Sequence, residues 1–109
     1  MSPRIENETL SQNGWSASLS FPSEERYFQG HFPGFSVLPG VIQLGVAVKI
    51  AAERLGKSSS PRQVKKMKFT RVIVPEETVT LALVVKGENE IAYEYRKGEY
   101  SCSSGILCY

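Results

Sequence analysis

A helix that is apolar on nearly every side is the feature that most restricts the fold of this chain. Residues Gly40 to Leu55, GVIQLGVAVKIAAERL, follow a proline that suits a first helical turn and precede Gly56, which suits a C-cap. Ten of these sixteen residues are apolar, and they spread around most of the helix circumference. A helix of this kind is enclosed by other structure. We therefore expect the rest of the chain to wrap around it.

Five strands are predicted around this helix. The run Trp15 to Phe21 alternates apolar with small polar residues and ends at a proline, which is typical of a half-buried strand. Turn-forming residues separate four further β-like runs at the short spacing of an antiparallel meander, and these are Gln63 to Thr70, Thr78 to Lys86, Glu90 to Arg96 and Tyr100 to Cys108. We expect a single α+β domain, residues 1–109, in which an antiparallel sheet curls around a central helix.

The charge balance and the first residues exclude several classes of protein. Thirteen Lys and Arg against eleven Asp and Glu leave a formal charge of only +2, far from the basic excess of a general nucleic-acid binder. The start, MSPRIENETL, lacks the basic and apolar regions of a secretory signal, and no apolar run approaches the ~18 residues of a membrane span. We expect a cytoplasmic protein that binds neither nucleic acid nor membrane.

Metal ions and nucleotide cofactors have no support in the sequence. One histidine and two distant cysteines make no ligand set for a metal. Cys102 and Cys108 lie six residues apart in a predicted strand, too far along it to form a disulfide, so both are expected as reduced thiols. No glycine-rich nucleotide-binding pattern appears. We therefore expect no cofactor.

The only histidine lies in a stretch rich in glycine, proline and aromatic residues, which we expect to form an ordered loop before the helix. The residues around this histidine carry a resemblance. Gly30-His31-Phe32-Pro33-Gly34, followed by Val37-Leu38-Pro39-Gly40-Val41, resembles the GHFPG-x-P-V-x-P-G-V signature of the β-hydroxyacyl-acyl carrier protein dehydratases, a hotdog-fold family. The stretch Lys68 to Pro75 resembles that family's KF-x-R-x-V-x-P strand, so the resemblance covers nearly the whole chain. The step Gln43-Leu44 resembles the dehydratase-like branch found with aryl-polyene pathways. The resemblance implies a hotdog fold.

The resemblance also implies an activity, a partner and an assembly. The expected reaction is removal of water from a 3-hydroxyacyl thioester in fatty-acid or polyketide-like synthesis. The expected partner is acyl carrier protein, which carries the thioester. The expected assembly is a homodimer or a higher oligomer, with its sites at the subunit interface.

Dehydration of a 3-hydroxyacyl thioester requires a base, a donor for the enolate oxygen and an acid for the leaving hydroxyl. His31 can serve as the base because an unperturbed imidazole titrates near neutrality. The Gly40 amide lies at a helix start, where N–H groups lack intrahelical partners and the dipole favours negative charge. The resemblance assigns the same role to Gly40, and it implies that the backbone carbonyl of Val37 orients the imidazole. Phe32 and Val41 are candidates for lining the acyl tunnel.

The acid is where the sequence departs from the family pattern. The resemblance implies a carboxylate five residues after Gly40, where this chain has Gly45, and a glutamine four residues later, where it has Lys49. We keep Gly45 and Lys49 as substrate-binding candidates. Either dehydration is lost, or another side chain supplies the proton, the candidates being Lys49, Gln43, Glu24 and Glu25. The alternative functions are a catalytically weak or inactive acyl-thioester or acyl carrier protein binding subunit, and a hotdog acyl thioesterase.

Two groups of residues admit more than one interpretation. We expect a role mainly in the hydrophobic core, and secondarily in the wall of the substrate site, for the helix positions Val41, Leu44, Val48 and Ala52. Between Lys49 and Arg71 lie eight of the thirteen basic residues and one acid. These basic residues are either a solvated face or a dock for the acidic acyl carrier protein, since charge complementarity raises association rates.

Overall fold

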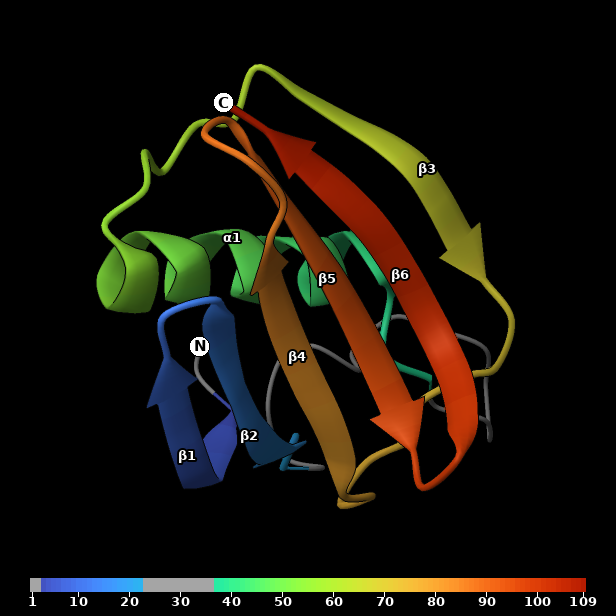
Figure 1. Ribbon diagram of the computed structural model, residues 1–109. Coiled ribbons are helices and arrows are strands. Elements are labelled where there is room, and N and C mark those ends of the chain that lie inside the picture. The colour runs from blue at the N-terminus through green and yellow to red at the C-terminus, as the bar shows by residue number, and fades with distance from the viewer. Residues whose placement is uncertain (1–2, 23–36) are drawn as a thin grey trace.

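The computed structural model describes residues 3–22 and 37–109, and in them one antiparallel sheet holds one helix against a single face (Figure 1). In chain order the elements are β1 Arg4–Ser11, β2 Gly14–Ser20, α1 Gly40–Leu55, β3 Gln63–Phe69, β4 Val79–Val85, β5 Glu90–Lys97 and β6 Tyr100–Cys108. The strands follow the order β1-β2-β4-β5-β6-β3 across the sheet. The edges of the sheet are therefore β1 and β3.

The bounds of α1 agree with the prediction from its flanking residues. Pro39 is extended, with φ −62° and ψ 146°, and the helix begins at the next residue. Gly56 adopts the left-handed conformation with φ 68°, and the N–H of Lys57 donates to the Ala51 carbonyl at 3.3 Å. This is the geometry by which glycine ends helices. Within the described ranges, no helix has the length and apolarity needed to cross a membrane.

The first strand, β1, was missed by the sequence analysis. It pairs with β2, and its register shifts between Glu6 and Thr9, where Asn7 has a positive φ of 57°. Such a bulge adds one residue to the strand and breaks the two-residue alternation of its side chains. Only Ile5 and Leu10 of this strand are apolar. The period-two pattern that indicates a strand is therefore absent from its sequence.

The core lies between the sheet and one face of the helix. Trp15 on β2 is opposite Leu83 on β4, which in turn is opposite Tyr93 on β5, and all three are buried. Their alternation with more exposed neighbours is that of strands with one face covered. Cys102 and Cys108 are both buried, and both are free thiols, the state that the sequence predicts.

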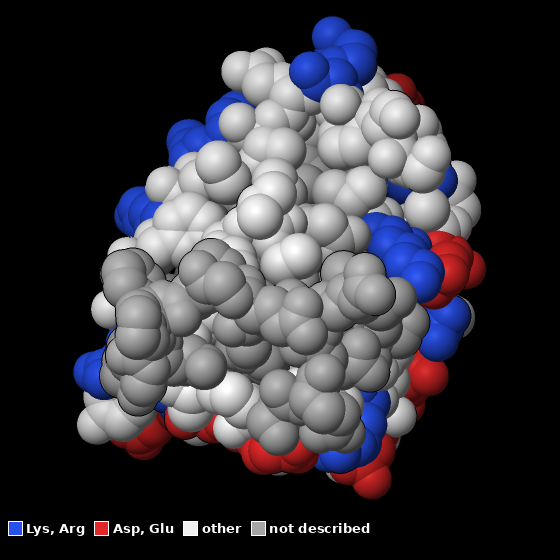
Figure 2. All heavy atoms as spheres, turned by 180° about the vertical axis from the view of Figure 1, so that it is seen from behind, with Lys and Arg blue, Asp and Glu red and all other residues white. Residues whose placement is uncertain are grey.

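The helix packs on one side only, which corrects the predicted core face. Its buried residues are Gln43, Val46, Ala47, Ile50 and Ala51. The prediction that Val41 belongs to the core is wrong, because its side chain is 72% exposed. Leu44, Val48 and Ala52 are only partly buried. The sheet of a single chain covers one side of α1, and Figure 2 shows a broad uncharged area on the helix side of the molecule.

Candidate active site

A pocket of about 510 Å³ opens where helix α1 begins. Its walls come from the segment before the helix, the first helical turn and the connection that follows β3. The lining residues are Val37, Leu38, Pro39, Gly40, Gln43, Phe69, Thr70, Arg71 and Val72. Apolar walls with a few polar groups are typical of small-molecule sites. The pocket is therefore suited to an apolar ligand that carries a polar group near the helix start.

The helix start presents free backbone donors to this pocket. The first intrahelical bonds run from the Ile42 and Gln43 amides to the Pro39 carbonyl, at 3.1 and 3.2 Å. The Gly40 and Val41 amides therefore precede the bonded turn, and they have no acceptor among the described residues. The first turn also has no acidic side chain. No described acidic side chain in the first turn compensates the positive end of the helix dipole, which favours a developing negative charge.

Gly40 is held beneath an aromatic ring from the edge strand. A Cβ atom at Gly40 would lie 2.7 Å from Cε1 and from Cζ of Phe69, closer than real Cβ contacts. The Phe69 ring therefore covers the glycine, although 53% of the side chain is exposed. The absence of a side chain at Gly40 lets the ring from β3 reach the helix start and form one wall of the pocket.

A buried polar network ties the first helical turn to the sheet. Ser103 donates from its hydroxyl to Oε1 of Gln43 at 2.6 Å, and Nε2 of Gln43 donates to the Leu38 carbonyl at 3.1 Å. The Tyr95 hydroxyl donates to the Gln43 carbonyl at 2.7 Å. Burial raises the pKa of Tyr95 well above its usual value, so this hydroxyl stays a neutral donor. The Gln43 side chain is 3% exposed, and the network fixes the helix start by three hydrogen bonds.

The remaining walls of the pocket are anchored by the backbone. The Leu38 N–H donates to the Ile73 carbonyl at 2.7 Å. The Thr70 N–H donates to the Cys102 carbonyl at 2.8 Å, and its hydroxyl donates to the Ser101 carbonyl at 2.7 Å. The segment before the helix and the connection after β3 are thus joined to each other and to β6.

The structure brings together some of the predicted site residues and separates others. Val37 and Gly40 both line the pocket. Val41, Gly45 and Lys49 lie outside it, one helical turn apart, on the exposed side of α1. The predicted residues His31, Phe32, Glu24 and Glu25 lie outside the described residues.

At the position of the missing carboxylate, the described residues leave room. A Cβ atom added at Gly45 would meet none of their atoms within 4 Å. Gln43, named from the sequence as a substitute donor, already uses its side-chain amide to bind Leu38 and Ser103. This geometry weakens the case for Gln43 as an acid, because its amide is held in the buried network.

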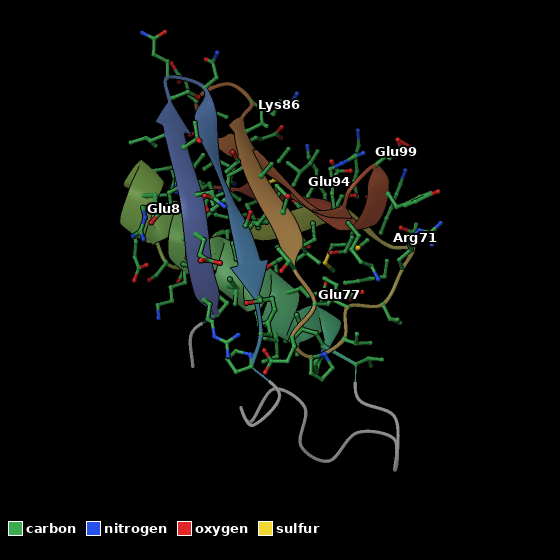
Figure 3. The ribbon with its side chains drawn as sticks, turned by 90° about the horizontal axis from the view of Figure 1, so that it is seen from below. Glu8, Arg71, Glu77, Lys86, Glu94 and Glu99 are labelled. Atoms are coloured by element: carbon green, nitrogen blue, oxygen red, sulfur yellow. The ribbon has the colours of Figure 1, made fainter. Side chains whose placement is uncertain are left out.

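Basic residues between Lys49 and Arg71 do not form one surface. Lys65 binds Glu90 at 2.7 Å, and this bond raises the pKa of Lys65, while Arg54 binds Glu8 at 2.8 Å on the helix side. Other lysines border a second hollow, of about 500 Å³, which includes residues of β4, β5 and β6. Its lining includes Lys66, Lys68, Lys86 and Glu94. Figure 3 shows Lys86 and Glu94 on the side of the sheet away from α1.

Sequence reasoning missed the partners that define the pocket. Phe69 was noted only as part of a matching strand, and nothing local indicates that its ring reaches Gly40. Ser103 and Tyr95 were assigned to strands without any role. The one available signal was Gln43 itself, because a glutamine among apolar helical residues requires a buried partner.

An antiparallel sheet wrapped against one helix, with a pocket at the helix start, is the architecture of the hotdog-fold dehydratases. Residues 6–106 match the family model of the ApeI-like proteins, described as ApeI dehydratase. The chain belongs to this family.

Similar proteins agree with this assignment. The 3-hydroxyacyl-[acyl-carrier-protein] dehydratase FabZ of Oenococcus oeni is 35% identical over 95 residues, which cover 76% of this chain and 68% of that protein. The FabZ of Staphylococcus aureus strain Newman is 38% identical over 68 residues, which cover 56% of this chain and 47% of that protein. The match thus spans about half the length of the S. aureus relative.

Two solved structures show the same fold. A chain of the dehydratase heterocomplex ApeI:P from Xenorhabdus doucetiae superposes with a TM-score of 0.84 at 23% identity, covering 99% of this chain and 97% of the other. An uncharacterized protein from Erwinia carotovora subsp. atroseptica superposes with a TM-score of 0.80 at 24% identity, covering 99% and 95%. The predicted hotdog fold is therefore confirmed.

Proposed function

We propose that this chain acts on 3-hydroxyacyl thioesters carried by acyl carrier protein and removes water from them. The observation that carries the proposal is the backbone amide of Gly40, which has no acceptor among the described residues and lines a mostly apolar pocket. A thioester needs this combination, because its carbonyl gains negative charge as the reaction proceeds while its acyl chain remains apolar. The names of the FabZ relatives support the same substrate class.

In the proposed reaction the Gly40 N–H donates to the thioester carbonyl oxygen and makes the adjacent carbon more acidic. His31 accepts a proton from this carbon, C2. The electron pair left on C2 forms the double bond to C3 as the bond from C3 to the hydroxyl breaks. The hydroxyl accepts a proton and leaves as water. Without a carboxylate at Gly45, the source of this last proton is the open step of the reaction.

We also propose that the chain forms a homodimer through the helix side and the β3 edge. Apolar side chains gather there, with exposed fractions of 72% for Val41, 53% for Phe69, 52% for Val72 and 47% for Met67. An edge strand beside exposed apolar side chains is a surface that proteins usually cover. Sedimentation of the purified chain tests the assembly, and a monomer at micromolar concentration would contradict it.

One observation favours a second candidate, a subunit that binds the thioester but depends on another chain for its acid. Gly45 lies on the exposed side of the helix, and a Cβ atom there would meet no atom of the described residues within 4 Å. A carboxylate from a different protein can enter this space. The neighbour from Xenorhabdus doucetiae is described as a heterocomplex, which is consistent with such an arrangement.

The test is an assay of purified chain with a 3-hydroxyacyl-carrier thioester, following enoyl formation. We expect product from the native chain and at least a hundredfold less from His31→Ala, since positioned general bases contribute about 10²–10⁴-fold. Equal rates from both proteins would contradict the dehydratase proposal. If only a Gly45→Glu variant forms the enoyl product, this result would favour the second candidate, a subunit that depends on another chain for its acid. Release of free thiol in place of enoyl product would favour a thioesterase.

A further inference from the structure

One cation lines the proposed thioester pocket, and the activity proposed above leaves it without a role. Arg71 follows β3 and is the single charged residue among those that line the pocket in the described part of the chain. Figure 3 shows it at the margin of the molecule, on the opposite side from Glu8. The other lining residues offer apolar walls, backbone amides or neutral polar groups.

The surroundings of Arg71 hold it in place. Its guanidinium carbon lies 4.2 Å from the centroid of the Tyr100 ring, within the range of a cation–π contact. Its backbone N–H donates to the Cys102 carbonyl at 3.1 Å, and the neighbouring Thr70 N–H donates to the same carbonyl at 2.8 Å. A guanidinium stacked on a ring keeps its edge and its N–H donors available to a ligand.

The charge of Arg71 is not neutralised by the carboxylates nearby in the described residues. No ion pair links it to any of them. Glu77 on the same connection binds Lys97 at 2.9 Å. Arg96 binds Glu94 at 3.2 Å. The Glu99 carboxylate, which Figure 3 shows on the same side of the molecule, forms no ion pair with Arg71. As far as the described residues go, Arg71 is therefore available to an external anion at the pocket.

We propose that Arg71 binds the phosphate of the pantetheine arm to which the acyl group is attached. The inference rests on the proposed function, because it requires a thioester in the pocket. Arginine suits the ligand, since its planar fork matches two oxygens of a phosphate. The thioester would lie at the backbone amide of the helix start, and the phosphate would lie beside the Arg71 guanidinium. The shared chemistry is a phosphate ester, present in a carrier-bound arm and in a coenzyme A arm alike.

The test compares thioesters that differ only in this phosphate. A crotonyl thioester of 4′-phosphopantetheine and one of unphosphorylated pantetheine are titrated into native protein, Arg71→Ala and Arg71→Lys by calorimetry, which needs no turnover. The matched control is Arg62→Ala, which removes an exposed arginine just before the other end of β3. A thermal melt of each variant verifies folding.

We expect Arg71→Ala to weaken binding of the phosphorylated thioester about tenfold, the scale of one charge-assisted contact at an exposed site. Binding of the unphosphorylated thioester should not change, Arg71→Lys should retain part of the affinity, and Arg62→Ala should bind as the native chain does. Equal losses for both thioesters, or no loss for either, would overturn the role of Arg71. If the native chain binds neither thioester, the proposed function fails as well.

Two further ligands distinguish the source of the phosphate. Crotonyl-carrier protein and crotonyl-coenzyme A are titrated into the native chain and Arg71→Ala. If Arg71→Ala lowers the affinity for crotonyl-carrier protein and for the crotonyl thioester of phosphopantetheine by similar factors, this supports recognition of the pantetheine arm. A loss confined to coenzyme A would overturn the assignment, because Arg71 would then contact the nucleotide part of that ligand.

Discussion

The Phe69 ring lies over Gly40 so closely that a Cβ atom at Gly40 would be 2.7 Å from two of its carbons. This contact connects an edge strand to the first residue of the helix. It also places the ring beside the backbone amide to which we assign the thioester oxygen. The shape of the pocket thus depends on the absence of one side chain.

Replacement of Gly40 by alanine tests this contact. We expect Gly40→Ala to lower the free energy of unfolding by about 1 kcal/mol, since the added methyl must displace the ring. Thioester binding should weaken, because the displaced ring is a wall of the pocket. The double variant Gly40→Ala with Phe69→Leu should recover part of both losses, as measured by urea unfolding and calorimetry. Strictly additive losses would show that the two residues do not interact.

The two tyrosines of β5 provide a matched pair. The Tyr95 hydroxyl donates to the Gln43 carbonyl, whereas the Tyr93 hydroxyl is buried with no hydrogen-bond partner in the described residues. Tyr95→Phe should lower the free energy of unfolding by about 1 kcal/mol, because it removes a buried hydrogen bond that joins β5 to the helix. Tyr93→Phe should leave stability unchanged or raise it. Urea unfolding of both variants checks the contrast, and equal losses would refute it.

Gly45 supports a prediction about stability and one about rate. The position is exposed and interior to the helix, and a Cβ atom there would meet no atom within 4 Å in the part of the chain that the structure describes. Gly45→Ala should therefore raise the free energy of unfolding, measured by urea unfolding, by about 1 kcal/mol through helix propensity.

Gly45→Glu should raise the rate of enoyl formation well above that of Gly45→Gln, if the native site lacks an acid. Equal rates for the two variants would show that this position does not supply the proton.

Glu8 joins β1 to the helix in a pH-dependent way. Its carboxylate accepts hydrogen bonds from Arg54 at 2.8 Å and from Trp15 at 2.9 Å, and these bonds lower the pKa of Glu8. A lowered folded-state pKa means that the carboxylate stabilises the fold above the unfolded value of about 4.3. This contribution is lost as the pH falls through the folded-state pKa.

The variant Glu8→Gln removes the charge and keeps the shape. Near neutral pH it should unfold at a lower urea concentration than the native chain. The difference should shrink as the pH is lowered below the folded-state pKa of Glu8, where the native side chain is protonated too. A difference that is constant with pH would contradict the ionic role.

Local signals predicted the helix and most of the strands, and the resemblance of the motifs around His31 and Gly40 implied the hotdog family. The helix bounds depend on Pro39 and Gly56, whose backbone preferences act within a few residues. The strands β2 to β6 follow from alternation and turn residues. The strand β1 did not follow, since the bulge at Asn7 breaks its alternation and the partner that selects it is β2.

The tertiary structure decided which side of the helix is buried and what surrounds its first turn. Periodicity could not choose between Val41 and Val46, because apolar residues lie on most sides of α1 and only the position of the sheet distinguishes them. The contacts of Gln43 with Ser103 and Tyr95 span 60 and 52 residues of chain. Local sequence determined the elements and their ends because backbone preference acts over a few residues. The pocket needed the fold, since its walls meet only when distant segments pack together.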